Sequence, residues 1–164
     1  MRSAYRTLAV VLVVVAQSAH AETFEGVVVR VVDGDSLVVL RGTEQVRVRL
    51  KEIDAPEHSQ PFGNRSRQSL NAMCAQKRAR VSWTETDRNG RTLGRVWCGG
   101  VDANAEQVRR GMAWVFDRYV RDRTLYPLQD SARSDRLGLW AAAAPIAPWE
   151  WRAAKGQLEY RAKK

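Results

Sequence analysis

Residues 24–50 read FEGVVVRVVDGDSLVVLRGTEQVRVRL and contain three runs of apolar residues separated by short polar breaks. Gly34 interrupts the first run, residues 24–32, and the second run resumes at residues 37–40. In the third run, residues 46–50, apolar and basic side chains alternate, which is the period of a half-buried strand. The three runs together predict a meander of three strands.

The next part of the chain predicts a helix and two more strands. The helix begins near residues 61–64, and Leu70, Met73 and Cys74 follow at the i, i+3, i+4 spacing of one buried face. Strands are expected near residues 78–84 and at residues 92–98, with a turn between them. Five short strands with interleaved helices favour an α+β fold, a small barrel with helical caps.

The C-terminal part is predicted to be mostly helical. Asn104 can cap a short helix that Gly111 ends. Residues 125–137 can form another helix. From about residue 141 two prolines predict an irregular tail, and Trp149 and Trp151 are expected to pin it to the body.

The N-terminus has the features of a secretory signal peptide over residues 1–21. Arg2 and Arg6 precede an apolar run, and Ala19-His20-Ala21 fits the small-residue cleavage pattern. The alternative is a retained membrane anchor, but the apolar run is too short to span a bilayer. We therefore expect a single domain at residues 22–164. We expect it to be periplasmic or secreted, with no stable membrane association after cleavage.

The charge of the chain favours a polyanionic partner. The net charge is +9, from 27 Lys+Arg and 18 Asp+Glu. Loss of Arg2 and Arg6 would leave 25 Lys+Arg, and so a net charge of +7. A basic exported protein is expected to meet nucleic acid. The alternative is that the charge serves only solubility.

Cys74 and Cys98 are the only cysteines. A pair of cysteines in an exported protein predicts one disulfide, and two buried thiols are the alternative. Two cysteines and two histidines, one of them in the signal peptide, are too few for a zinc pattern.

Two aspartates form a candidate metal site. Asp35 lies where a turn enters a strand, Asp54 lies where a strand ends, and Gly34 allows a close backbone approach. Carboxylates combined with carbonyls and waters suit Ca²⁺, which prefers several flexible oxygen ligands. An isolated Asp-Gly-Asp is also common in ordinary turns, so the motif alone does not establish the site.

Glu57 and the nearby arginines supply the other candidate groups. Glu57 follows Asp54 across a rigid proline and could activate a water as general base. Arg49 shares the polar face of its strand with Arg47 and Lys51, so periodicity cannot choose among the three. Arg91 follows the glycine of a turn. Two guanidinium groups could neutralise charge on a phosphorane-like transition state.

Two further residues beside these candidates receive no functional role. Glu52 is expected to be a solvated loop residue, and His58 a surface residue.

Four segments in order resemble the staphylococcal nuclease family. They are VDGDS at residues 32–36, VRLKEIDAPE at 48–57, DRNGRTLGRV at 87–96 and NAEQVRRGMA at 104–113. Gly138-Leu139-Trp140 also fits the closing helix of that family. The resemblance covers roughly residues 24–140.

The resemblance implies a fold and a set of site residues. The fold would be an OB-fold five-stranded β-barrel capped by three α-helices. Ca²⁺ would be held by Asp35, Asp54 and the carbonyl of Ala55. Arg49 and Arg91 would grip the phosphate, Glu57 would be the base or the water-orienting carboxylate, and Arg88 and Tyr119 are the candidate nucleic-acid contacts.

The function that follows from the resemblance is that of an exported, Ca²⁺-dependent nuclease. It would hydrolyse DNA and RNA, with single strands or frayed duplex preferred, leave 3′-phosphate ends and act as a monomer. We expect Arg49, Glu57 and Arg91 to lie at the polar mouth of the barrel and to matter for rate more than for folding.

Two other classes of function compete with this interpretation. One is a catalytically inactive OB module that binds single strands through a basic groove and aromatic stacking. The other is a structural envelope protein that uses the barrel for protein contacts. The presence of all five charged residues, Asp35, Arg49, Asp54, Glu57 and Arg91, argues against both.

Overall fold

The structure, a computed structural model, describes residues 21–162, and their side chains as far as residue 158. The predicted signal peptide therefore lies outside the described residues, except for Ala21. The first strand begins at Glu22, the residue after the predicted cleavage point. None of the helices in the described part of the chain is both long and apolar enough to cross a membrane.

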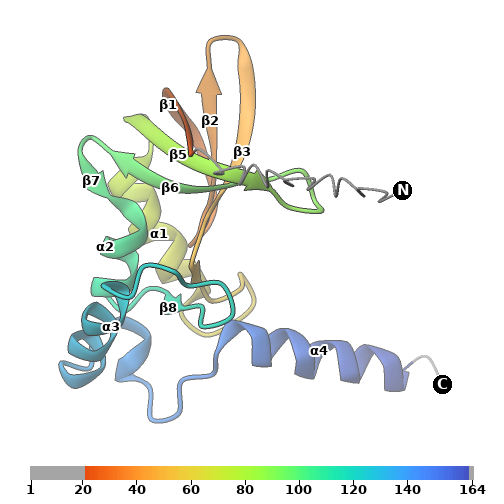
Figure 1. Ribbon diagram of the computed structural model, residues 1–164. Coiled ribbons are helices and arrows are strands. Elements are labelled where there is room, and N and C mark those ends of the chain that lie inside the picture. Colours follow the sequence, from red (N-terminus) through yellow and green to blue (C-terminus); the bar gives the residue numbers. More distant parts are fainter. Residues whose placement is uncertain (1–20, 163–164) are drawn as a thin grey trace, which may run out of the picture.

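A closed barrel of five strands forms the body of the described chain (Figure 1). Its strands are β1 Glu22–Asp33, β2 Ser36–Arg41, β3 Glu44–Leu50, β5 Arg78–Thr86 and β6 Thr92–Cys98. Neighbouring strands pair antiparallel in the order β3-β2-β1-β5-β6, and β3 pairs with β6 in parallel to close the barrel. Short strands lie outside the barrel: β7 Val101–Asp102 extends β6, and β4 Ile53–Asp54 pairs with β8 Trp114–Val115.

β1 contains irregularities that allow the sheet to curve into a barrel. It pairs with β2 along one edge and with β5 along the other. The β1–β2 register shifts between Val28 and Arg30, and again between Val31 and Asp33. Such irregularities bend a strand and increase its twist, which a small barrel needs to close.

The helices lie at one end of the barrel (Figure 1). They are α1 Gly63–Cys74, α2 Ala103–Arg109, α3 Leu125–Ser134 and α4 Pro148–Ala162, with a 3₁₀ turn at Gly138–Ala141. α1 packs against β1, and α2 packs against α3. Fully buried side chains from the strands and α1 fill the core between them, including Val28, Val39, Leu50, Leu70, Val81 and Val96.

The predicted meander, the two later strands and the first helix are confirmed, with bounds that differ by a few residues. The cap of the short helix was wrongly predicted. Asp102, not Asn104, accepts the capping hydrogen bond, from the backbone N–H of Ala105 at 3.1 Å. Asn104 is buried and instead links β6 to the chain just after β3. It donates to the carbonyls of Lys51 and Gly94 and accepts from the N–H of Val96.

The C-terminal part also differs from the prediction. α3 ends at Ser134, because Arg136 takes a positive φ of 51° and turns the chain away. The tail is irregular only between the 3₁₀ turn and residue 147, and α4 follows, so the described chain has four α-helices rather than three. Trp149 does pin the tail, because its ring stacks on Phe116 with 5.2 Å between ring centroids.

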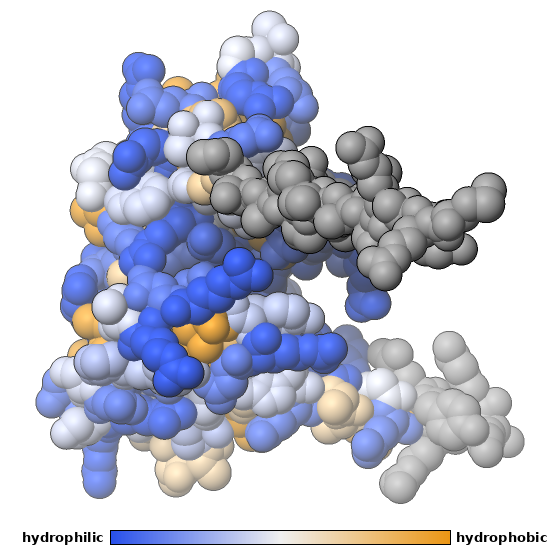
Figure 2. Space-filling model, in the orientation of Figure 1, coloured by the Kyte–Doolittle hydropathy of each residue, from blue (hydrophilic) through white to orange (hydrophobic). Residues whose placement is uncertain are grey.

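The surface is rich in charged groups. The face in Figure 2 is mainly hydrophilic, and its hydrophobic residues lie in small separate groups. This distribution agrees with the high net charge of the sequence.

The structure contains the disulfide between Cys74, the last residue of α1, and Cys98, the last residue of β6. The two residues are 24 apart in sequence and both are buried. The bridge therefore ties the end of α1 to the end of β6. Closing a loop of this length in the unfolded chain is worth roughly 3–4 kcal/mol on the chain-entropy account, although the origin of that stabilisation is disputed.

We predict that the double variant Cys74→Ala/Cys98→Ala melts on the order of 10 °C below the wild type, as loss of that stabilisation implies. Thermal unfolding with and without a reductant measures the difference. A wild-type Tm that is insensitive to reductant, together with two titratable thiols in the unfolded unreduced chain, would contradict the bridge.

Asp122 contributes stability that depends on pH. The hydroxyl of Thr124 and the guanidinium of Arg95 both donate to its carboxylate, and these hydrogen bonds lower its pKa to about 2. Because the folded pKa lies below the unfolded one, this stabilisation is present above the ordinary pKa of Asp and is lost as the pH falls towards 2.

We therefore predict that Asp122→Asn lowers the free energy of unfolding at neutral pH and that the difference from wild type shrinks as the pH falls below about 4. Urea denaturation at a series of pH values measures it. Asp130→Asn, on the exposed side of α3, is the matched control. A difference that stays constant across this range would show that the charge of Asp122 is not responsible.

Candidate active site

Asp35 is buried at the turn between β1 and β2, with an exposed fraction of 2%. The hydroxyl of Ser36 donates to its Oδ1 at 2.9 Å, and the backbone N–H of Ala55 donates to its Oδ2 at 2.8 Å. The preceding Gly34 is required by close packing, since a Cβ there would lie 1.8 Å from Oγ of Ser66. The contact with Ala55 brings the β1–β2 turn against the segment that carries Asp54.

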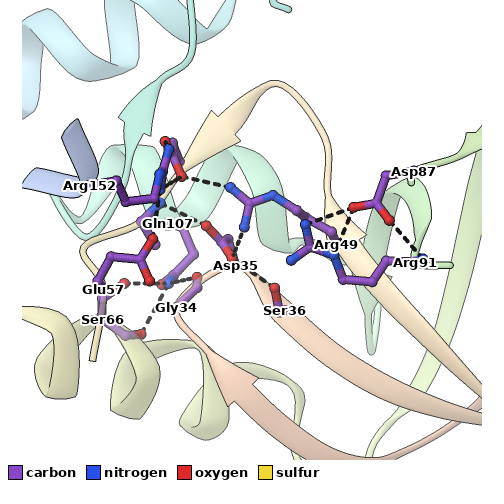
Figure 3. A network of polar contacts seen from close by, with 12 residues as sticks. Gly34, Asp35, Ser36, Arg49, Glu57, Ser66, Asp87, Arg91, Gln107 and Arg152 are labelled. Atoms are coloured by element: carbon purple, nitrogen blue, oxygen red, sulfur yellow. Dashed lines mark hydrogen bonds and ion pairs between the residues drawn. The ribbon is translucent and has the colours of Figure 1, made fainter. Parts of the chain in front are cut away.

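Arg49 joins Asp35 to Asp54. Its Nη1 donates to Oδ1 of Asp35 at 2.7 Å, and its Nη2 donates to Oδ1 of Asp54 at 2.6 Å (Figure 3). Asp54 lies in β4 and is fully buried, and the Arg49 side chain is 19% exposed. The structure therefore brings three of the predicted site residues into one charged cluster.

The geometry also distinguishes Arg49 from the other basic residues on the same strand. Arg47 points elsewhere and donates to the carbonyl of Asn89 at 2.8 Å, so Arg49 is the arginine that contacts the aspartates. The position of Arg49 at the polar mouth of the barrel stays a prediction, and its side chain is largely enclosed. Because it is enclosed between two buried carboxylates, its truncation would cost stability as well as rate.

Burial and the neighbouring opposite charges shift the pKa values of Asp35 and Arg49 in opposite directions. Burial raises the pKa of Asp35, and the neighbouring Arg49 only partly offsets this. For Arg49, burial alone would lower the pKa, but the negative charges of Asp35 and Asp54 outweigh it and raise the pKa. Arg49 is therefore a permanent cation, and the two aspartates depend on it for compensation.

Glu57 lies on the loop after β4, and its side chain is 40% exposed. Oε1 of Gln60 accepts from the backbone N–H of Glu57 at 3.1 Å, which shapes the loop. Gly63 packs so tightly against this loop that a Cβ would lie 1.9 Å from the carbonyl oxygen of Glu57. The start of α1 thus holds Glu57 beside Asp54, with its carboxylate free to reach solvent.

Arg152 of α4 contacts both carboxylates and was not identified from the sequence. Its Nη1 donates to Oε1 of Glu57 at 2.7 Å, and its Nη2 donates to Oδ2 of Asp54 at 2.6 Å. The hydrogen bond with Asp54 is the main reason why the pKa of Arg152 is raised. The only indication in the sequence was its position directly after Trp151, in a tail expected to pack on the body.

Arg91 is held by Asp87 on the turn between β5 and β6. Both Nε and Nη2 of Arg91 donate to Oδ2 of Asp87, at 2.8 and 2.7 Å. Burial acts against the charge of Asp87, but hydrogen bonds from Arg91 and Asn89 outweigh it and lower its pKa. Because Thr92 pairs with Val48, Arg91 is close along the sheet to the strand of Arg49 (Figure 3).

The two predicted nucleic-acid contacts lie apart from the charged cluster. Arg88 is exposed at the tip of the same turn as Arg91. Tyr119 is 57% exposed and packs edge-on against Phe116, with ring centroids 4.9 Å apart. Neither Arg88 nor Tyr119 is hydrogen-bonded to the two aspartates of the cluster or to Glu57. His58 is exposed as predicted, but Glu52 is buried, so its prediction as a solvated residue was wrong.

Gln107 packs beneath the turn that carries Asp35, and it was also not identified from the sequence. It is fully buried in α2, and its Nε2 donates to the carbonyl of Gly34 at 2.6 Å and to that of Ser66 at 3.1 Å. Its Oε1 is buried with no hydrogen-bond partner. A polar residue among the apolar positions of a short helix was the available indication in the sequence.

The residues present fit a hard cation. Asp35 and Asp54 are close enough to share one guanidinium, and Ala55 touches Asp35 through its N–H, which brings its own carbonyl into the same region. No group of three or more His, Cys, Asp or Glu side chains suited to a metal occurs within the described residues. Two carboxylates, a backbone carbonyl and waters form the kind of oxygen site that Ca²⁺ accepts.

Comparison with known proteins agrees with this geometry. Residues 47–142, more than half of the chain, match the family described as staphylococcal nuclease homologue. A protein named micrococcal nuclease from Shigella flexneri is 41% identical over 169 residues, covering 94% of this chain and 97% of the relative. A protein named ParB from Escherichia coli is 42% identical over 155 residues, covering 88% and 87%.

A third relative, from Escherichia coli O157:H7, is named an uncharacterized endonuclease. It is 43% identical over 128 residues, covering 77% of this chain and 84% of its own. The matched region contains β5, β6, the last residues of β3, and Arg49 and Asp54 of the charged cluster, whereas Asp35 precedes it. On this evidence the chain belongs to the staphylococcal nuclease family.

Proposed function

We propose that this nuclease hydrolyses phosphodiester bonds in DNA and RNA with Ca²⁺ as its cofactor, and leaves 3′-phosphate ends. The observation that carries the proposal is the Asp35–Arg49–Asp54 cluster with Glu57 beside it. A paired carboxylate site for a cation, a fixed guanidinium and a solvent-accessible carboxylate are the groups that phosphodiester hydrolysis needs.

Each side chain has a defined part in the reaction. Asp35, Asp54 and the carbonyl of Ala55 would hold the cation, which supplies Lewis-acid polarisation of the phosphate when bound. Glu57 orients a water and accepts its proton as the water oxygen bonds to phosphorus. Arg49 and Arg91 stabilise the extra negative charge as the bond to the 5′ oxygen breaks, and the departing oxygen takes a proton from solvent water.

The substrate proposal rests on charge and on one exposed aromatic ring. The basic surface attracts the phosphate backbone, and this attraction is independent of base sequence. The exposed Tyr119 offers a face for a base, and Arg88 extends the basic surface beside Arg91. Stacking needs an unpaired base, so we propose that single strands or frayed duplex are preferred, bound by a monomer.

We also propose that the protein acts after export to the periplasm or beyond. The signal-like N-terminus supports this, and so does a disulfide, which persists in oxidising compartments.

We predict that cleavage of DNA and RNA requires a divalent cation and that Ca²⁺ is more effective than Mg²⁺. Mg²⁺ demands tighter octahedral geometry than Asp35 on one segment and Asp54 and Ala55 on another provide. Cleavage of single-stranded DNA and of RNA, measured with each cation and with excess chelator, tests this. Full activity in chelator would exclude the cofactor, and binding without cleavage in Ca²⁺ would favour the inactive OB module.

We predict that Arg49→Lys lowers turnover on the order of 10²–10³-fold. Lysine keeps the positive charge but cannot make the planar, bidentate contact of a guanidinium with the phosphate. Arg30→Lys, exposed on β1, is the control. Arg47 is unsuitable because it donates to the turn that carries Arg91. Turnover on single-stranded DNA and a thermal melt are measured for each variant. Equal turnover at equal Tm would exclude Arg49 from the phosphate clamp.

A further inference from the structure

α4 is outside the region that matches the family, and it is attached to the body only at its start. The carbonyl of Ile146, just before the helix, accepts from Nε2 of Gln60 at 2.7 Å. Trp149 in its first turn stacks on Phe116. The side chains of residues 153–158 are all exposed, and the helix extends away from the barrel (Figure 1).

Arg152 is the residue by which this helix reaches the site. Its guanidinium spans Asp54 and Glu57, and its contacts take in both carboxylate oxygens of Asp54, at 3.3 Å to Oδ1 and 2.6 Å to Oδ2 (Figure 3). Asp54 Oδ1 also accepts from Arg49. Among the described residues, Arg152 is thus the only hydrogen-bond partner of Oδ2 of Asp54.

Arg152 occupies the position that a cation on Asp54 would need. A Ca²⁺ ion binds carboxylate oxygens at about 2.3–2.6 Å. Nη2 of Arg152 lies 2.6 Å from Oδ2 of Asp54. An ion and a guanidinium nitrogen cannot both approach this oxygen from the same side at that distance, so an ion on Oδ2 requires Arg152 to withdraw from it.

The charge balance of the cluster also indicates that Arg152 withdraws when a cation binds. Asp35, Asp54 and Glu57 carry three negative charges when ionised, and Arg49 and Arg152 carry two positive ones. A divalent cation added to this set would leave a net charge of +1. With Arg152 withdrawn, the same cation makes the cluster neutral, so binding of the cation and withdrawal of Arg152 favour each other.

We infer that Arg152 is a tethered competitor of the divalent cation and that α4 is an autoinhibitory element, which is released from the site as the cation binds. This inference rests on the proposed Ca²⁺-dependent function. The side chain of Arg152 is 42% exposed and the side chains of residues 153–158 are exposed, so Arg152 and the later turns of α4 can withdraw while Trp149 stays on Phe116. Competition would keep the nuclease inactive wherever Ca²⁺ is scarce.

The direct test is calorimetric titration of Ca²⁺ into the wild type and two variants. Arg152→Gln removes the competing charge and is expected to bind Ca²⁺ roughly five- to tenfold more tightly. Lys155→Gln is the matched control, because it removes one positive charge from an exposed position one turn further along the same helix. It is expected to bind Ca²⁺ within about twofold of the wild type.

The outcomes separate the inference from the proposed function. If the wild type and Arg152→Gln bind Ca²⁺ with equal affinity, the Ca²⁺ site stands and the competitor role is overturned. Weaker binding by Arg152→Gln would also overturn it, and would make Arg152 a residue that positions the carboxylates. If neither protein binds Ca²⁺, the proposed cofactor fails and the inference falls with it.

Amide hydrogen exchange gives a second readout that does not depend on activity. In the wild type, Ca²⁺ is expected to increase exchange in residues 152–158. In Arg152→Gln, exchange there is expected to be high with or without Ca²⁺. Thermal melts in chelator confirm that both proteins are folded. Exchange in α4 that does not respond to Ca²⁺ in the wild type would overturn the release of the helix.

Discussion

The ion pairs of Arg49 with Asp35 and Asp54 are the interaction on which the site depends. Two carboxylates that are almost completely buried cannot both remain charged without a partner, and Arg49 reaches one with each Nη atom. Removing one partner of such a cluster is expected to cost on the order of 3–5 kcal/mol, since it leaves uncompensated buried charge. The cluster also fixes geometry, because it holds the β1–β2 turn at a defined distance from the end of β4. A cation bound there would take over part of the same compensation, which links metal binding to stability.

Packing between elements holds this cluster in place. Gly34 lies so close to Ser66 of α1 that no larger residue fits, and Gln107 of α2 donates to the carbonyls of both. Asn104 bonds to β6 and to the chain just after β3, while the disulfide fixes the end of α1 against β6. The proposed catalytic groups thus lie on turns and strand ends, whereas the residues that position them are buried in helices. α4 is the exception, since it contacts the carboxylates from a segment that packs on the body only through its first turn.

Much of the barrel was predictable from local pattern. Alternation in residues 46–50 identified β3, and the valine-rich runs identified β1 and β2, because one face of each strand must be buried. The family resemblance then selected Arg49 from three equivalent basic residues. The prediction failed where long-range contacts decide the outcome. Asn104 is a good capping residue by type, but in the folded protein its side-chain amide donates to the carbonyls of Lys51 and Gly94 instead. Arg152 could not be placed at the site, because a helix after two prolines carries no local information about a partner 98 residues earlier.

We propose the aspartates joined by Arg49 as the cation site of this nuclease. A crystal structure determined at saturating Ca²⁺ tests it most directly. We expect one ion within about 2.3–2.6 Å of a carboxylate oxygen of Asp35, a carboxylate oxygen of Asp54 and the carbonyl oxygen of Ala55. An ion bound elsewhere, or this cluster without an ion under those conditions, would contradict it.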